Sequence, residues 1–170
     1  MTKASDRKRE EERYSRRLDR HLDELKWLYM ELYDSQEHWE ELLAAMKQFA
    51  MQRKTSLKKL DETREQDPGW YRRSGMLGMM LYVDQFAGTL KGVQEKLDYI
   101  RRCRVNYLHL MPLLESPKGR SDGGYAVADF RKVQENLGTM EDLERLAAAC
   151  HRRGISLCLD FVMNHTSEDQ

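Results

Sequence analysis

The chain has 170 residues and a mass of 20.2 kDa, enough for one ordinary domain or two small ones. Its 29 basic residues balance its 29 acidic ones, and zero net charge argues against a nucleic-acid binder or a polybasic membrane-surface protein. No run of about 18 apolar residues predicts a membrane span. The charged N-terminus lacks the apolar core of a secretory signal, so we expect a cytoplasmic protein.

Glycine and proline usage divides the chain into two parts. All ten glycines lie at or after Gly69 and all three prolines at or after Pro68, so the preceding residues contain no strong helix breaker. There, apolar side chains recur at three- and four-residue spacing over residues 14–32 and 39–50. This pattern predicts amphipathic helices. We expect an all-α N-terminal domain over residues 1–67 and a second domain over residues 68–170.

Short polar segments predict where these helices begin. Asp34 with Glu37 resembles a capping box between the two apolar patterns. Thr55 and Ser56 can cap a third, short helix that Asp67 and the following proline end. The charged side chains of this part are expected to form solvated helix faces.

The second part alternates strand and helix patterns. Apolar runs predict buried strands over residues 79–83, 105–110 and 155–162. Amphipathic segments over residues 90–102 and 140–153 predict helices between them, the second with Thr139 as N-cap and Gly154 as its stop. The order βαβαβ predicts a parallel sheet with right-handed crossovers.

Polar residues gather after the second and third expected strands. The long connection over residues 112–137 contains Ser-Asp-Gly-Gly-Tyr at 121–125, and the third strand runs into Asp160, Asn164 and His165. Because loops at the carboxyl ends of parallel strands build active sites, we expect a site at this edge. Two plainer interpretations stay open: the glycine pair forms only a turn, and His165 only satisfies backbone groups at the strand end.

Four segments carry a resemblance to glycoside hydrolase family 13, the α-amylase family. Residues 160–165, Asp-Phe-Val-Met-Asn-His, resemble its first conserved region at the end of the third barrel strand. In order and spacing, residues 82–92, 108–113 and 121–127 resemble its amylosucrase branch, which also has a helical N-terminal domain. The resemblance implies a helical segment followed by an incomplete (β/α)8 TIM barrel, truncated after strand three.

The resemblance also implies an activity. It predicts the N-terminal part of a sucrose-using α-glucosyltransferase, which converts sucrose to α-1,4-glucan and fructose by retaining double displacement. No cofactor and no metal are expected, and sucrose and α-glucan are the expected partners of the complete enzyme. The family's nucleophile and acid/base lie on later strands, beyond Gln170, so we assign no catalytic residue and expect these residues alone to be inactive. A separate remaining portion of the barrel could complete them.

The resemblance implies three sugar-binding residues. Asp122 and Tyr125 would be walls of the pocket for the transferred glucose, and His165 would donate a hydrogen bond to a glucose hydroxyl. A carboxylate accepts from sugar hydroxyls and an aromatic face stacks on a pyranose ring, so these residue types suit the task.

Three further residues are expected to support the site. Asp160 would orient a partner such as an arginine on the fourth strand, and Asn164 would make a structural hydrogen bond rather than bind calcium. Asp84, after the first strand, would position its loop. His109 lies inside a strand and is interpreted as a core or barrel-interior residue.

The same sequence features are compatible with other functions. Sucrose hydrolase, trehalose synthase and α-amylase are neighbouring activities in the same family. A non-catalytic helical interaction module is the alternative outside enzymes.

Overall fold

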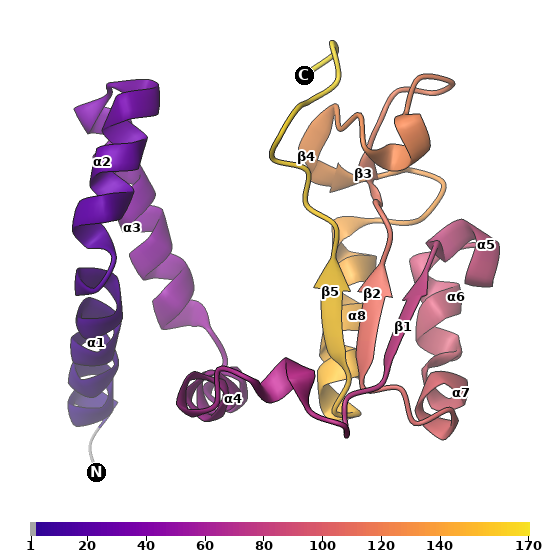
Figure 1. Ribbon diagram of the computed structural model, residues 1–170, viewed down its shortest axis with the longest axis horizontal. Helices are drawn as coiled ribbons and strands as arrows, with labels where there is room; N and C mark the ends of the chain where they lie inside the picture. The colour runs from indigo at the N-terminus through magenta and orange to yellow at the C-terminus, as the bar shows by residue number, and fades with distance from the viewer. Residues whose placement is uncertain (1–2) are drawn as a thin grey trace. The chain divides into compact units, whose positions relative to one another are not determined.

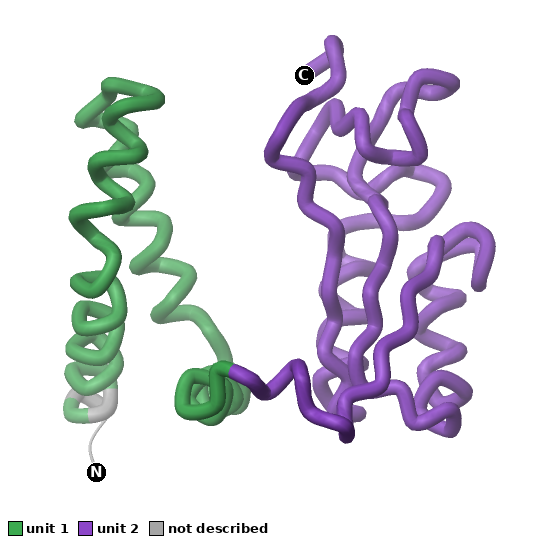
Figure 2. The backbone as a smooth tube through the Cα atoms, viewed as in Figure 1, with its two compact units in different colours: residues 1–68 green, residues 69–170 purple. Residues whose placement is uncertain are grey.

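The computed structural model describes residues 3–170, with side-chain detail for residue 5 and from residue 7 onward. The chain forms two compact units, Met1–Pro68 and Gly69–Gln170 (Figure 2). The first unit is helical and the second contains the sheets (Figure 1). The expected order, N-terminal helices followed by a parallel βαβαβ arrangement, is confirmed.

The first unit consists of helices whose boundaries differ in detail from the sequence patterns. They are α1 (Lys3–Asp19), α2 (Leu22–Tyr33), α3 (Gln36–Gln52) and α4 (Thr55–Gln66). The first apolar pattern is therefore two helices, not one. The expected capping box is wrong, because the Ser35 hydroxyl accepts the His38 N–H at 3.3 Å while Asp34 ends α2 with φ +44°. Thr55 is the first residue of α4 rather than its cap.

Aromatic and ionic contacts join these helices. Trp39 is buried, and its ring lies 5.4 Å from that of Tyr29 between centroids. Ion pairs from Arg13 to Glu62 and from Arg17 to Glu65 join α1 to α4. Such exposed pairs each contribute at most about 1 kcal/mol. The first unit therefore depends on a thin apolar core.

The second unit is built on a parallel sheet. Its strands are β1 (Gly78–Leu81), β2 (Tyr107–Leu110) and β5 (Ser156–Leu159), in the order β1-β2-β5. The first crossover contains α5 (Val83–Ala87), α6 (Leu90–Glu95) and α7 (Leu97–Arg102), and the second contains α8 (Met140–Arg152). Figure 1 shows α6, α7 and α8 on one face of this sheet.

Three details of this unit correct the sequence expectations. Val83 begins α5 instead of ending the first strand. The helix expected over residues 90–102 is interrupted at Lys96, whose side chain donates to the Phe86 carbonyl at 2.6 Å. The long connection after β2 contains an antiparallel pair, β3 (Leu114–Glu115) with β4 (Asp129–Val133), and a short 3-10 helix η2 (Asp122–Gly124). A further 3-10 turn, η1 (Trp70–Arg72), precedes β1.

Strand alternation decides which side chains enter the core. Leu108 and Leu110 of β2 are fully buried, together with Leu90, Val93 and Leu146 of the helices. Successive side chains of a strand point to opposite faces, so the residues between the leucines lie on the other face. That face bears Met80, His109 and Cys158, which are aligned across the three strands.

Both ends of α8 follow the sequence prediction. The Thr139 hydroxyl accepts the Asp142 N–H at 3.2 Å, and the Asp142 carboxylate accepts the Thr139 N–H at 3.1 Å. This capping box satisfies two N–H groups that the helix leaves unpaired. Gly154, with φ +69°, follows the helix, as a glycine stop requires.

Replacing Gly92 with alanine is expected to destabilise the protein, although alanine normally favours a helix by about 1 kcal/mol. A Cβ at this position would overlap the Ala87 carbonyl oxygen and lie 3.1 Å from its carbon and 3.2 Å from its Cβ. Overpacking of this kind costs about 1–3 kcal/mol. Urea denaturation of the full chain, followed by circular dichroism, measures the change.

Gly78→Ala is the matched control, because the nearest atom to its added Cβ is 3.8 Å away. The control should be at least as stable as the parent protein. Equal stability of the two variants would show that α5 and α6 do not pack as described.

Candidate functional site

The candidate site lies at the carboxyl ends of β2 and β5. The connection with β3, η2 and β4 follows β2, and residues 160–170 follow β5. Both segments lie beyond the same end of the parallel sheet (Figure 1). In parallel α/β folds this is the edge at which ligand sites form.

A tight turn fixes Asp122 and Tyr125. Asp122, Gly123 and Gly124 have φ values of +49°, +68° and +95°, a conformation that glycine adopts readily and other residues rarely do. A Cβ on Gly124 would also lie 2.9 Å from the Pro112 Cβ. The predicted turn is therefore present, and its backbone has little freedom to move the two side chains that flank the glycines.

The Asp160 carboxylate joins three segments of the second unit. One oxygen, Oδ1, lies 2.8 Å from Nε2 of His109 on β2. The other, Oδ2, accepts the Tyr125 hydroxyl at 2.9 Å. The side chains of His109 and Asp160 are 28% and 22% exposed, so this carboxylate is held partly away from water. Its two hydrogen bonds therefore connect the strand, the turn and the segment after β5.

The Asp160 carboxylate also changes the acidity of Tyr125. The hydrogen bond from the phenol to Asp160, together with partial desolvation and the negative charge, raises the pKa of Tyr125 above its ordinary value. The carboxylate favours the neutral phenol, because ionisation would remove the donated proton and place two negative charges together. Tyr125 thus remains a neutral hydrogen-bond donor throughout the physiological pH range.

The segment that carries His165 is attached to the same connection at several points. The Ser167 N–H donates to the Val127 carbonyl at 2.8 Å, and Ser167 is buried. Arg120 pairs with Asp169 at 3.3 Å. With Asp160 bound to Tyr125, the segment is anchored on both sides of His165.

The predicted site residues are not all in mutual contact. His165 is exposed, and its Nδ1 lies 3.3 Å from the Asn164 amide nitrogen. Among the described residues, its hydrogen bonds join it to neither Asp122 nor Tyr125. Asp84 lies on α5, where its backbone carbonyl accepts the Gly88 N–H at 3.0 Å and its side chain is exposed.

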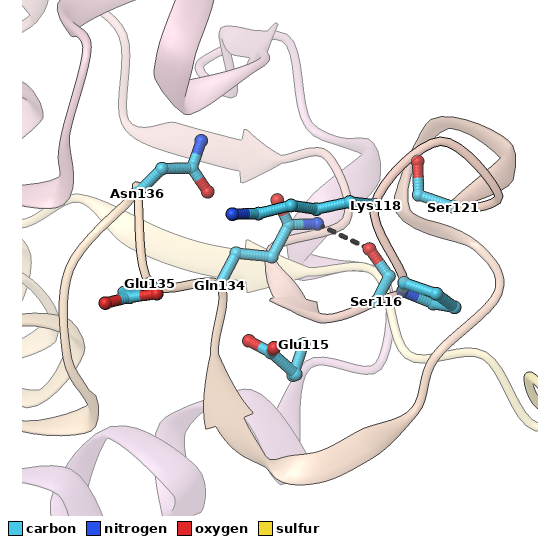
Figure 3. Close-up of a pocket in the computed structure, with 8 residues that line it drawn as sticks. Glu115, Ser116, Lys118, Ser121, Gln134, Glu135 and Asn136 are labelled. Atoms are coloured by element: carbon cyan, nitrogen blue, oxygen red, sulfur yellow. Dashed lines mark hydrogen bonds between the residues drawn. The ribbon is translucent and has the colours of Figure 1, made fainter. Parts of the chain in front are cut away.

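A hollow of about 850 Å³ lies beside the turn. It is lined by Glu115, Ser116, Pro117, Lys118, Ser121, Gln134, Glu135 and Asn136. Figure 3 shows the Gln134 amide donating to the Ser116 hydroxyl, at 2.9 Å, with Lys118 extended across the hollow. Carboxylate, amide, hydroxyl and ammonium groups together suit a ligand rich in hydroxyls.

Two kinds of feature are absent from residues 3–170. They contain no cluster of three or more His, Cys, Asp or Glu side chains suited to a metal ion. None of their helices combines the length and apolar character that crossing a bilayer requires.

The contact between His109 and Asp160 was not predicted. We expected His109 only as a core or barrel-interior residue, and an arginine on the fourth strand as the partner of Asp160. A usable signal was present, because His109 stands between two leucines of one strand and must point away from their face. A polar side chain on that face needs a hydrogen-bond partner.

Comparisons with known proteins show which family and which proteins this chain is similar to. A family model described as "Alpha amylase, catalytic domain" matches residues 63–170. Amylopullulanase of Thermoanaerobacterium thermosulfurigenes is 41% identical over 95 residues, 56% of this chain and 5% of that protein. A trehalose synthase/amylase of Mycolicibacterium smegmatis is 41% identical over 107 residues, 60% of this chain and 18% of that protein.

A solved structure shows the same relationship. A variant of isomaltulose synthase from Erwinia rhapontici, in complex with its natural substrate sucrose, superposes with a TM-score of 0.51 at 31% identity. The superposition covers 56% of this chain and 18% of that one. The chain thus spans less than a fifth of the length of each of these three relatives.

Replacing Asp160 with asparagine is expected to lower the pKa of Tyr125 toward its ordinary value near 10. The amide is a weaker acceptor and carries no charge. Because the folded pKa is raised, the contact stabilises the fold fully below the ordinary pKa, and this stabilisation is lost as pH rises through the folded value. The tyrosinate absorbance of the full chain, titrated with pH, measures the shift.

The chain has eight tyrosines, so each titration is taken as a difference against the same protein carrying Tyr125→Phe. An unchanged Tyr125 transition in the Asp160→Asn protein would refute the described hydrogen bond.

Proposed function

This chain belongs to the α-amylase catalytic-domain family, and from that premise we propose that it forms the donor-sugar side of an α-glucosyltransferase active site. The proposed donor is sucrose and the proposed reaction is amylosucrase-like: transfer of glucose to an α-glucan, with release of fructose. The single observation that carries the proposal is the Tyr125–Asp160 hydrogen bond. It places the Asp122–Tyr125 turn at the carboxyl edge of the sheet.

Each proposed binding residue has a chemical task. Asp122, exposed within the turn, would accept hydrogen bonds from glucose hydroxyls. The Tyr125 ring, held by its hydroxyl, would offer an aromatic face to the pyranose ring. His165 would donate to a hydroxyl, with Asn164 beside it to orient the imidazole. We propose that Asp84 only positions the loop after β1.

The hollow beside the turn supports a second saccharide contact. It shares Ser121 with the turn, whose carbonyl accepts the Gly124 N–H at 2.9 Å. A sugar in the hollow would therefore lie close to one bound at Asp122. We assign the hollow to the acceptor.

Bond cleavage is assigned to other residues. In retaining double displacement, one carboxylate attacks C1 while a carboxylic acid protonates the departing fructose oxygen; the acceptor hydroxyl then attacks C1 as the second group takes its proton. These two groups stand about 5–5.5 Å apart in retaining enzymes. Neither the nucleophile nor the acid/base group is assigned to this chain. The proposed contribution of the chain is therefore sugar binding.

We propose two domains, with the sugar-binding residues in the second one. Residues 1–67 would form a helical domain and residues 68–170 the first portion of the catalytic barrel. Sucrose is supported by the isomaltulose synthase complex with that sugar. Amylopullulanase and trehalose synthase/amylase favour α-glucans or trehalose as the alternative substrates.

Asp122→Asn is expected to lower kcat/KM for sucrose by about 10- to 100-fold in the full-length protein that contains this chain. The loss follows from removing a charged hydrogen-bond acceptor, which contributes about 1.5–3 kcal/mol. Fructose release measures the reaction, with maltooligosaccharides and trehalose assayed in parallel.

Asp98→Asn is the control, because this exposed aspartate of α7 pairs with Arg153 at 2.8 Å and lies on a crossover helix. Its activity should match that of the parent protein. Full activity of Asp122→Asn would exclude Asp122 from the site, and turnover of trehalose or glucan without fructose release from sucrose would replace the proposed donor.

A further inference from the structure

His109 lies on strand β2 and contacts the candidate site through Asp160. It lies on β2 between Leu108 and Leu110, both fully buried against the helices. Its own side chain therefore points to the opposite face of the sheet. In the parallel register His109 aligns with Cys158, and Asp160, two residues further along, lies on the same face within hydrogen-bond reach.

The chemistry of this contact fixes the form of the imidazole. An ionised carboxylate only accepts hydrogen bonds, so Nε2 of His109 must carry the proton that lies between the two side chains. The contact to Oδ1 is 2.8 Å, a normal length for such a bond. His109 thus holds one oxygen of Asp160, which leaves the other directed at the Tyr125 hydroxyl 2.9 Å away.

We propose that His109 is a positioning residue for donor-sugar binding. Through Asp160 it fixes the rotation of the carboxylate, and the carboxylate fixes the Tyr125 ring that forms the wall of the glucose pocket. His109 touches no sugar itself. The inference rests on the proposed function, because it requires Tyr125 to contact the donor.

The rigid turn allows the contacts from His109 through Asp160 to determine the orientation of Tyr125. The backbone around Tyr125 is held by bonds from its own N–H to the Asp122 carbonyl at 3.2 Å and from the Ala126 N–H to the Ser121 carbonyl at 2.9 Å. With the backbone fixed, the side-chain torsions of Tyr125 are what remain free. The hydrogen bond from the Tyr125 hydroxyl to Asp160 restricts these torsions. Loss of His109 should therefore let the Tyr125 ring rotate more freely.

A double-mutant cycle in the full-length protein tests this coupling. His109→Leu should lower kcat/KM for sucrose about tenfold when Tyr125 is present, as expected for one charge-assisted hydrogen bond. In the Tyr125→Phe background the same change should have an effect of about twofold or less, because the route through the hydroxyl is already cut. His109→Gln, whose amide can donate from near the Nε2 position, should retain activity within about threefold.

Two controls accompany the cycle. His38→Leu replaces an exposed histidine of α3, and Tyr99→Phe a half-exposed tyrosine of α7; neither should change the kinetics. Circular dichroism of each variant checks that it is folded. An equal loss from His109→Leu in both backgrounds, or no rescue by His109→Gln, would overturn the proposal.

A second measurement does not depend on turnover. The ¹⁵N spectrum of the histidine rings in the full-length protein should show His109 as the Nε2–H tautomer, and Asp160→Asn should remove that preference. An Nδ1–H tautomer in the parent protein would overturn the inference. If the parent protein turns over no α-glucoside at all, the proposed function fails instead, and the spectrum shows whether the His109–Asp160 contact is nevertheless present.

Discussion

The second unit depends on the hydrogen bonding of one carboxylate. Asp160 follows the last parallel strand and is only 22% exposed, and a partly buried charge is costly unless hydrogen bonds replace the lost water. It obtains them from His109 on the middle strand and from Tyr125 in the connection between the strands. These partners are 51 and 35 residues away in sequence. Satisfying one charge therefore links three segments, in addition to the pairing of β2 with β5 and the Ser167–Val127 and Arg120–Asp169 contacts.

A second constraint acts on the backbone. Three consecutive residues with positive φ, Asp122–Gly124, reverse the chain in a space too small for a Cβ at Gly124. The rigid turn and the Asp160 hydrogen bonds act together: one fixes the backbone on either side of the glycines, and the other fixes the ring of Tyr125. The proposed sugar-binding wall would thus be ordered before a ligand arrives, and little conformational entropy would be lost on binding.

Family membership is shown over residues 63–170, and the side chains proposed to bind the substrate lie within the same residues. The matched segment, residues 63–170, contains the parallel strands, their crossovers and the turn. Its relatives include amylopullulanase, trehalose synthase/amylase and isomaltulose synthase, so the shared framework occurs in enzymes with different names and activities. Fold and function separate in this way because the chemistry is decided by a few side chains and loops on the shared framework. The hollow lined by Glu115, Lys118 and Gln134, proposed to take the acceptor, also belongs to this framework.

Local sequence patterns were sufficient to predict the helical first part, the three parallel strands with helical crossovers, the capped ends of α8 and the glycine turn, because periodicity, capping and positive φ depend on neighbouring residues. They also located the polar residues at the carboxyl edge, since parallel strands place their ends together. Tertiary structure alone decided the partners of Asp160, the helix break at Lys96 and the β3–β4 pair within the long connection. Each depends on which distant segments pack together, and strand register brings His109 within reach of Asp160. The leucines beside His109 indicate that its side chain needs a hydrogen-bond partner on the other face, but they do not identify Asp160 as that partner.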